Sequence, residues 1–486
     1  MAGALLDVTS EIGALRKVVV HAPGPEWDLV PFVSHLAQQY LIDDILLLGE
    51  AEKEHRALRE VLGLFVGEEN VIEFSDLVAE ACEDRSHREQ IITAIAAFEF
   101  LGDAVSEQLL DKSLSAKEVA TALICGAIVP QTLAKAEYEN LFRSIPNLLF
   151  TRDLGAAVGG AFIAGYPAKE ARRRESLLLR FVLKHSDLFK GAKVIDIRNL
   201  ANENFWAETM AATTESPWKQ GSIEGGDILV LDKDTLMIGT GERTTEDGLY
   251  LVMSMLLEDE EVDSLERVVR VVLPEDRSSM HLDTVLTIID RNQFLAFGRI
   301  IQEAKFFIYQ YPFAPGFADA PPLSFGEALA KLGMKSAEIV NCGGDNPLFQ
   351  SREQWTDGAN LFAIAPGVVV GYDRNVETAK ALREHGYRYL EPANTSGRKE
   401  IEKIAEQVRS GEPTERILIG LRSSELSRAR GGARCMTLPL ERDPVQTLGS
   451  HSGRRSWGFG GIRGWFAATK RPGAAYRPER TRTYKA

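Results

Sequence analysis

The sequence predicts an α/β fold in which repeated modules are arranged around an axis and an all-helical insert interrupts them. The first observation is that most of the chain alternates short apolar segments with helix-like segments. The second is a unit of one acid, a strand, a tight turn and a second strand, which recurs at intervals of 74, 56 and 74 residues. The third is the segment 75–144, which has helical periodicity and little strand signal.

The N-terminal part shows this alternation. Residues 16–21 form a short apolar segment that ends at a Pro- and Gly-rich turn, which predicts a strand. Residues 50–64 have apolar side chains at helical spacing and opposite charges three and four positions apart, which predicts a helix. Residues 70–74 predict the strand that follows. The helical segments expected in the insert are 91–98, 105–110 and 116–124.

Four acids open the repeated units of the body. They are Asp153, Asp227, Asp283 and Asp357. Three units lead into helix-like segments, which are 169–184, 245–257 and 375–385. Modules around an axis bring equivalent positions together, and carboxylates that converge repel one another unless a cation is bound. Most of the 70 Asp and Glu residues are expected to be merely solvated, so it is the recurrence that indicates a shared cation site.

Composition limits the kind of protein. The chain has 486 residues, 44% of them hydrophobic, which is enough for a large core and two or three domains. A formal charge of −14 argues against nucleic acid as the main partner and favours a cationic ligand. No apolar run is long enough to span a membrane, and the N-terminus does not resemble a signal peptide. We therefore expect a cytoplasmic protein without membrane contact.

Cysteine and histidine spacing predicts no metal, no cofactor and no disulfide framework. The four cysteines are scattered without C-x-x-C pairs, and the eight histidines show no H-x-x-x-H pattern. The segment 446–486 is rich in Gly and Arg and is predicted to be an unpacked tail, with nine Lys or Arg and one acid from residue 449 onward. Two explanations stay open for it: contact with an anionic surface or nucleic acid, and a reading frame or end that differs from the natural one.

One thiol is a candidate nucleophile. Cys435 ends an arginine- and glycine-rich stretch and precedes apolar chain. A thiol attacks as its thiolate, neighbouring guanidinium groups lower its pKa, and glycines let the backbone approach a ligand closely. The alternative is an inert, half-buried cysteine that opens a core strand, where free cysteines usually lie. Cys342, in the segment Asn-Cys-Gly-Gly-Asp, is the competing nucleophile.

Two short motifs supply acid-base groups. Glu224 and Asp227 flank two glycines, which predicts two carboxylates aimed near one point. His281 and Asp283 are two positions apart, so in a strand they would lie on one face, as suits a general base beside an anchor for a charged ligand. Alone, His281 is more often a structural histidine. Together with a thiol and several acids, it is predicted to be catalytic.

Six segments, in their order along the chain, resemble the arginine deiminase family. They are 147–153, 224–227, 241–245, 280–285, 352–360 and 424–436. The resemblance implies a five-module α/β propeller of the guanidino-group-modifying superfamily, with an extra helical domain that matches the insert. The expected division is 1–74 for the first propeller part, 75–144 for the insert, 145–445 for the remaining propeller with the active site, and 446–486 for the tail.

The resemblance also implies a role for each reacting group. Cys435 would attack the guanidinium carbon of arginine, while Asp153 and Asp283 would accept hydrogen bonds from the guanidinium nitrogens. His281, supported by Glu224, would move protons to the departing ammonia and from the attacking water. The product would be citrulline, formed through a covalent amidino-thioether.

The implied substrate-binding residues are Arg243, Arg430, Asn147, Phe150 and Asp227. The two arginines match the family's clamps on the α-carboxylate of the substrate. The sequence departs from the family pattern at Leu154, Ala429 and Ala433. None of these changes removes a reacting group, so we expect them to alter loop stiffness and rate, and not the class of reaction.

We therefore expect an enzyme that hydrolyses free L-arginine to L-citrulline and ammonia. Alternatives are a hydrolase of methylated or peptide-bound arginine, an amidinotransferase, and a non-catalytic arginine-binding protein. The complete set of thiol, histidine and acids argues against a mere binder, which has no need of the thiol. Two arginines at the clamp positions argue for the free amino acid. A homo-oligomer is compatible with the sequence, which does not decide it.

Overall fold

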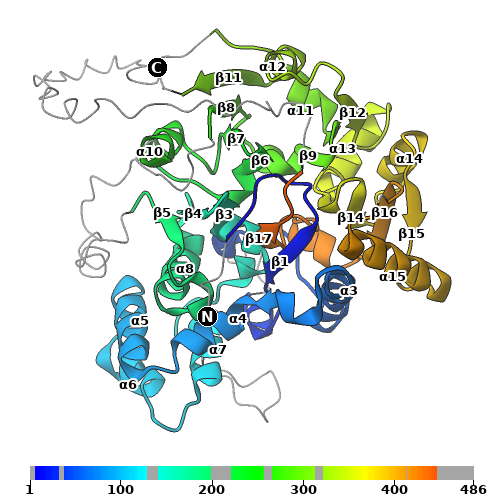
Figure 1. Ribbon diagram of the computed structural model, residues 1–486. Coiled ribbons are helices and arrows are strands. Elements are labelled where there is room, and N and C mark those ends of the chain that lie inside the picture. The colour runs from blue at the N-terminus through cyan, green and yellow to red at the C-terminus, as the bar shows by residue number, and fades with distance from the viewer. Residues whose placement is uncertain are drawn as a thin grey trace, which may run out of the picture. The chain divides into compact units, whose positions relative to one another are not determined.

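The computed structural model describes residues 6–31, 38–127, 141–198, 221–256, 265–311, 321–412 and 414–445 (Figure 1). These residues form a mixed α/β fold. The predicted tail 446–486 and the end of the predicted helix at residue 257 lie outside the described residues. No helix in the described ranges is both long and apolar enough to cross a bilayer.

The strands form five separate sheets within the described residues. In order of pairing they are β17 (Leu438–Arg442), β1 (Leu15–Val20) and β2 (Val71–Glu73); β3 (Gly155–Val158), β4 (Ala161–Ala164) and β5 (Lys193–Ile195); β6 (Ile228–Asp232), β7 (Thr235–Thr240), β8 (Arg267–Val272) and β11 (Lys305–Gln310); β9 (Leu286–Asp290), β10 (Gln293–Ala296) and β12 (Glu338–Asn341); and β13 (Phe362–Ala365), β14 (Val368–Tyr372), β16 (Ile417–Leu421) and β15 (Arg388–Leu390).

All five sheets share one connection pattern. The first strand pairs with the second antiparallel, and the second pairs with the third in parallel. Four first pairs are local hairpins, and each follows one of the four predicted acids, which confirms the repeated unit. The fifth pair joins β1 to β17, from opposite ends of the chain. Figure 1 shows these two strands, blue and orange-red, side by side.

The helices lie between and beside these strands. They are α1 (Pro25–Asp28), α3 (Leu48–Val66), α4 (Phe74–Ala81), α5 (Arg85–Phe98), α6 (Asp103–Leu109), α7 (Ala116–Cys125), α8 (Arg173–His185), α10 (Glu246–Leu256), α11 (Gly298–Glu303), α12 (Phe325–Lys331), α13 (Pro347–Trp355), α14 (Val376–Glu384) and α15 (Thr395–Ser410). Local sequence explains several starts. Asp84 caps α5 by accepting from Ser86 and His87, and Ser115 caps α7 in a capping box with Glu118.

The described part of the segment 75–144 contains most of α4 and all of α5, α6 and α7, and has no strand. Its apolar side chains do not form a core of their own. Leu77 and Ile92 belong to the same buried cluster as Phe162 on β4 and Leu178 on α8. In Figure 1 these helices gather beside α8. The helical content is as expected, whereas the separate domain stays a prediction.

One local prediction was wrong. The segment that contains His281 and Asp283 is not a strand, because Leu282–Thr284 forms one turn of 3-10 helix with His281 as its N-cap. Thr151–Leu154 and Gly225–Asp227 form similar single turns before their hairpins. Within such a turn, successive side chains fan out, so His281 and Asp283 contact different partners. The acids thus stand on short turns at the entry of each hairpin.

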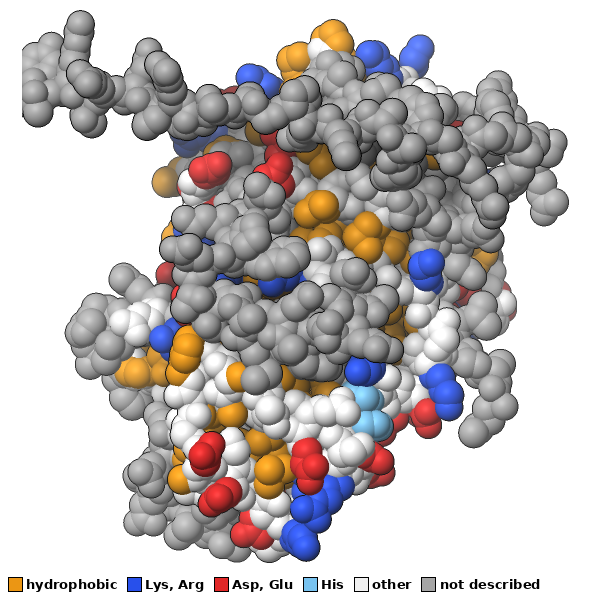
Figure 2. Space-filling model, turned by 90° about the vertical axis from the view of Figure 1, so that its left-hand side faces the viewer, with side chains coloured by type: hydrophobic (Ala, Val, Ile, Leu, Met, Phe, Trp, Pro, Cys, Tyr) orange, Lys and Arg blue, Asp and Glu red, His pale blue; other side chains and the backbone are white. Residues whose placement is uncertain are grey.

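The surface drawn in Figure 2 mixes side chains of both charges with apolar ones. Acidic and basic side chains are interspersed over the coloured area, and neither sign forms a continuous patch there. The chain's net charge is −14.

Candidate active site

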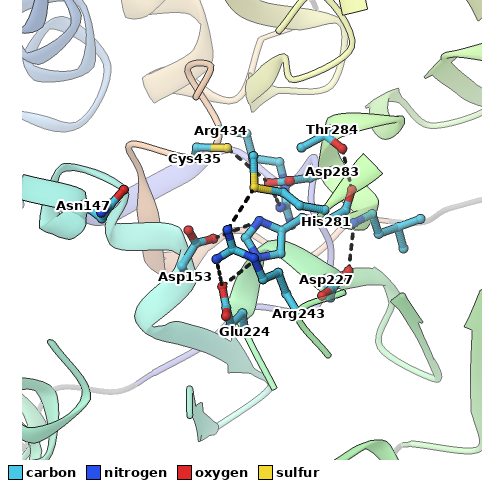
Figure 3. Close-up of polar contacts among 12 residues, drawn as sticks. Asn147, Asp153, Glu224, Asp227, Arg243, His281, Asp283, Thr284, Arg434 and Cys435 are labelled. Carbon is cyan, nitrogen blue, oxygen red and sulfur yellow. Dashed lines mark hydrogen bonds and ion pairs between the residues drawn. The ribbon is translucent and has the colours of Figure 1, made fainter. Parts of the chain in front are cut away.

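The predicted site residues gather around one small cavity. It is lined by Leu41, Asn147, Phe150, Asp153, Arg172, Arg243, Arg277, Met280, His281, Thr284, Ala429, Arg430 and Cys435. Seven of the ten predicted residues are therefore in its wall. Glu224, Asp227 and Asp283 are not. Glu224 contacts His281 and Asp283 contacts Cys435, both of which line the cavity, whereas Asp227 bonds to Leu282, the residue after His281 (Figure 3).

Two glycines allow the turns to approach this closely. A Cβ on Gly225 would lie 2.1 Å from the carbonyl oxygen of Arg152 and 2.2 Å from that of Gly155. A Cβ on Gly226 would lie 2.8 Å from both Asp153 Oδ1 and His281 Nδ1. No residue with a side chain fits either position, so the Gly-Gly pair brings the Thr151–Leu154 and Gly225–Asp227 turns together.

His281 lies between two carboxylates. Its Nε2 is 2.8 Å from Glu224 Oε2, and its Nδ1 is 3.6 Å from Asp153 Oδ1. Burial disfavours the charged ring, but Asp153 and Glu224 outweigh it and raise the pKa of His281 to about 9. The pKa of Glu224 is lowered despite burial, because Arg243 and His281 stabilise its charge. The imidazole is thus held protonated, with a proton to donate at neutral pH.

Cys435 lies in the turn before β17, and its side chain reaches the cavity. Its backbone N–H donates to Asn360 Oδ1 at 3.0 Å, and its thiol lies 3.8 Å from Asp283 Oδ2. Burial raises the pKa of the Cys435 thiol well above its usual range, and the charges of Asp283 and Asp153 add to the effect. Before a cationic ligand enters, the sulfur is therefore a neutral thiol.

Each of the two carboxylates beside the sulfur has one oxygen without a hydrogen bond among the described residues. Asp153 Oδ2 forms an ion pair with Arg172, and Asp283 Oδ2 accepts from Arg434 at 2.7 Å. The other oxygen of each, Oδ1, is buried and has no hydrogen-bond partner among the described residues. Buried acceptors are rarely left unpaired. The pair is therefore suited to a ligand that presents several N–H donors in one plane.

Guanidinium groups surround another part of the cavity. Arg243 is 3.5 Å from Glu224 Oε2, and its Nη2 is 3.6 Å from the Met280 sulfur. Arg430 has the left-handed backbone φ of 66°, donates to the Trp355 carbonyl at 2.7 Å and lies 3.4 Å from the centre of that ring. Both guanidinium groups line the cavity and are suited to an anionic group of the ligand.

Sequence reasoning missed two of these cations, Arg172 and Arg277. Arg172 is buried, pairs with Asp153 and Glu175, and lies 3.7 Å from Glu224. Its only local signal is a run of three arginines at the start of a helix, which also fits a solvated surface. Arg277 donates to the Leu41 carbonyl at 2.8 Å, beside the cavity.

Three predicted pocket residues have supporting contacts. Asp227 lies outside the wall and accepts the backbone N–H of Leu282 at 2.8 Å; burial raises its pKa to about 7. Asn147 donates to the Tyr40 carbonyl at 2.5 Å. The Phe150 ring lies where a Cβ on residue 431 would be, 2.2 Å away, which explains the glycine at that position.

One group of side chains has ligand atoms close enough for a metal ion among the described residues. It consists of Asp153, Glu224 and His281. Two guanidinium groups already neutralise these acids, because Arg172 contacts both carboxylates and Arg243 contacts Glu224. A metal cation would have to compete with both arginines, so the donor set is better suited to ion pairing and proton transfer.

These features define the class of site. A buried thiol next to two carboxylates that each have one unbonded oxygen, together with a histidine–glutamate pair and several arginines, is suited to a planar cation that also carries an anionic group. A guanidino acid is a molecule of that kind.

Comparison with known proteins agrees with this class. The family model described as arginine deiminase matches residues 38–442. The chain is 31% identical over 464 residues to an arginine deiminase of Limosilactobacillus reuteri, covering 91% of this chain and 99% of that protein. It is 31% identical over 457 residues to one of Listeria monocytogenes, covering 91% of this chain and 98% of that protein. The chain therefore belongs to the arginine deiminase family of enzymes.

Solved structures give a weaker likeness. An amidinotransferase from Microseira wollei, SxtG, is 14% identical and covers 91% of this chain and 99% of its own, with a TM-score of 0.47.

Proposed function

We propose that this protein hydrolyses free L-arginine to L-citrulline and ammonia through a covalent intermediate on Cys435. The observation that carries the proposal is the sulfur beside two carboxylates, Asp153 and Asp283, each with one buried oxygen that has no hydrogen-bond partner in the described chain. A guanidinium between them would satisfy both oxygens and bring its carbon to the thiol. Membership of the arginine deiminase family supports the same reaction.

In the first half of the reaction, Cys435 loses its thiol proton to solvent as the guanidinium binds, and the thiolate attacks the guanidinium carbon and forms a C–S bond. Asp153 and Asp283 hold the guanidinium nitrogens and keep the carbon in line with sulfur. His281, which is protonated and paired with Glu224, donates its proton to the departing nitrogen. The C–N bond breaks, ammonia leaves, and an amidino-thioether remains.

In the second half, water replaces ammonia. His281, now neutral, takes a proton from the water as its oxygen attacks the amidino carbon. The C–S bond then breaks with its electron pair going to sulfur, the remaining hydroxyl proton passes to sulfur, and citrulline leaves with a C=O bond. One argininium cation and one water give one citrulline, one ammonia and the one proton that the thiol released on substrate binding, and the protein returns to its starting state.

The positive charge of the substrate would explain how the Cys435 thiol, which is protonated in the free site, becomes a thiolate. The neighbouring carboxylates and burial keep Cys435 protonated in the absence of ligand. A guanidinium between Asp153 and Asp283 neutralises them and brings a positive charge next to sulfur, which lowers the pKa of the thiol. The nucleophile would therefore be activated mainly when substrate is present, and the resting thiol would be protected from oxidation.

The carboxylate end of arginine would contact the guanidinium groups of Arg243 and Arg430, which line the same cavity. A carboxylate there would be held by charge-assisted hydrogen bonds. The cavity is small, so the α-amino acid group would be the end of the substrate, with no peptide chain beyond it. This favours the free amino acid over a peptide-bound arginine.

A direct assay tests the proposal. Purified protein is incubated with L-arginine, and citrulline and ammonia are measured; the expected ratio is one to one. Ornithine without ammonia, in the presence of an amine acceptor, would indicate amidino transfer instead. Faster turnover of N-methylated arginine would move the assignment to that substrate, and arginine binding without any product would indicate a non-catalytic binder.

We also propose the architecture that the family implies. The five sheets with one shared connection pattern would be the modules of an α/β propeller, with residues 75–144 as an inserted helical domain. Each first strand would then run outward from the axis with its acid, or Cys435, near the centre. A crystal structure in which the five first strands do not surround one axis would contradict this arrangement.

A further inference from the structure

Arg434 directly precedes the candidate nucleophile, and its side chain connects two distant segments of the chain. It is 2% exposed. Its Nε and Nη2 each donate to a carboxylate oxygen of Glu11 at 3.1 Å, and Nη2 also donates to the Ile228 carbonyl at 2.8 Å. Its Nη1 donates to Asp283 Oδ2 at 2.7 Å. Figure 3 shows Arg434 beside Asp283 and Cys435.

Glu11 is held as firmly as Arg434. It is 5% exposed, its backbone N–H donates to the Val230 carbonyl at 2.8 Å, and its side chain accepts from the Val230 N–H at 3.3 Å. Burial works against its charge, but Arg434 and Arg152 outweigh burial and lower the pKa of Glu11 to about 2. The Glu11 carboxylate is therefore ionised, and hydrogen bonds to Val230 hold Glu11 against β6, the first strand of another sheet.

We propose that Arg434, held by Glu11, is a positioning residue for the reaction: it fixes one oxygen of Asp283 so that the other faces the substrate, and it adjusts the charge next to the Cys435 sulfur. This inference rests on the proposed function, since it assigns the orientation of a carboxylate that would bind the guanidinium. Two observations carry it. Arg434 and Cys435 share the same acceptor atom, Asp283 Oδ2, and the remaining oxygen is buried without a hydrogen-bond partner.

Several charged groups act on Cys435 from the elements around it. The acids are Asp153 and Asp283, each on its single 3-10 turn, and Asp357 after α13. Arg152 and Tyr372 also interact with the thiol electrostatically. Arg434 is the cation that neutralises the acid in contact with sulfur, and Glu11 in turn neutralises Arg434. Removing Arg434 should therefore raise the pKa of the Cys435 thiol, and removing Glu11 should lower it.

The test measures alkylation of Cys435 by iodoacetamide against pH, without arginine, by peptide mass spectrometry. Arg434→Gln leaves Asp283 without its counter-charge, so the pH midpoint should rise by about one unit. Glu11→Gln leaves Arg434 less neutralised, so the midpoint should fall by about half a unit. In the double variant, the midpoint should match that of Arg434→Gln, because Glu11 acts through Arg434.

A matched control separates positioning from stability. Arg180 and Asp196 form a buried ion pair, with Nε 2.9 Å from Oδ2, outside the cavity wall. Arg180→Gln should lower the melting temperature without moving the alkylation midpoint. Arg434→Lys keeps the charge but not the fork, so its midpoint should stay near that of the parent while kcat/KM for arginine falls at least about tenfold.

Three outcomes would overturn the proposal. They are an unchanged midpoint in Arg434→Gln despite a loss of stability like that of the control, a rise in Glu11→Gln, and full kcat/KM in Arg434→Lys. If Arg434→Gln does not fold, Glu11→Gln and Arg434→Lys still decide between positioning and a structural role. Alkylation needs no turnover, so a protein that makes no citrulline would refute the proposed function without affecting the measured charge effect.

Discussion

Two glycine-containing turns each hold a buried cysteine, and only one of them meets the cavity. Cys342, directly after β12, is 0% exposed, and Cys435, before β17, is 4% exposed. Both thiols have a raised pKa, and burial is the largest cause in both. Burial and nearby glycines therefore do not distinguish a reactive thiol from an inert one.

The difference lies in what each sulfur faces. The Thr378 hydroxyl lies 3.5 Å from the Cys342 sulfur, and a Cβ on residue 358 would be 2.9 Å from it, so protein atoms pack against this thiol. Cys435 instead lines the cavity beside Asp283 and its unpaired oxygen. A thiol reacts only with a ligand that reaches it, so tertiary surroundings separate the two cysteines.

The largest expected effect is on the cavity-facing thiol. Cys435→Ala should lower kcat for arginine by at least about ten-thousandfold, because no other group can form the covalent bond. Binding of arginine should persist, since the carboxylates and arginines that contact it remain. Citrulline assays and calorimetric titration measure the two properties. Turnover above a trace in this variant would remove the distinction between the two thiols.

The cations around the same cavity give the next effect. Arg243→Ala should lower kcat/KM for arginine by roughly a hundred- to several-thousand-fold, because a substrate carboxylate buried without its partner costs on the order of 3–5 kcal/mol. Agmatine lacks that carboxylate and should be a poor substrate of the parent. The ratio of kcat/KM for arginine to that for agmatine should be smaller in Arg243→Ala than in the parent.

Arg416→Ala, which removes an ion pair with Asp290 outside the cavity wall, is the control and should change neither substrate appreciably. Agmatine turned over by the parent as fast as arginine would contradict a carboxylate site at Arg243.

Proton linkage distinguishes the histidine beside the cavity from one elsewhere. The pKa of His281 is raised to about 9, above its unfolded value near 6.5, so its contribution to stability is complete below pH 6.5 and is lost as pH rises through 9. The difference in unfolding free energy between the parent and His281→Asn should therefore shrink by about 2–3 kcal/mol from pH 6 to pH 10.

The control for that measurement is His55, which is buried and whose pKa is lowered to about 4, with burial as the first cause. His55 is neutral in the folded and the unfolded protein above pH 7.5, so the difference in unfolding free energy between the parent and His55→Asn should stay constant from pH 7.5 to 10. If the difference between the parent and His281→Asn is also constant over that range, His281 is not held protonated.

The smallest effect is expected at the packed thiol. Cys342→Ala removes one buried sulfur and should cost about 1 kcal/mol of stability, by analogy with small core truncations. Its kcat for arginine should equal that of the parent, because the sulfur does not line the cavity. Denaturant unfolding and the citrulline assay measure both. A loss of activity without a loss of stability would make Cys342 part of the chemistry.

Local patterns in the sequence were sufficient for many elements. The four hairpins, the helix that became α3 and the position of each acid before its hairpin follow from periodicity and turn residues, which act over a few residues. The strand expected at His281 was wrong, because alternation over five residues cannot exclude a single 3-10 turn. The fifth sheet had no local signal, since β1 and β17 lie at opposite ends of the chain.

The sequence by itself determined which chemical groups are present: one thiol after a glycine-rich loop, a histidine near an acid, and acids at the entry of each hairpin. Only the tertiary structure decided which of them face a cavity and which charges pair. Arg172 with Asp153, and Glu11 with Arg434 and Asp283, are contacts between segments far apart in the chain or between side chains whose rotamers the fold selects. Pairing depends on distance in space and on burial, and neither is encoded in any short stretch of sequence.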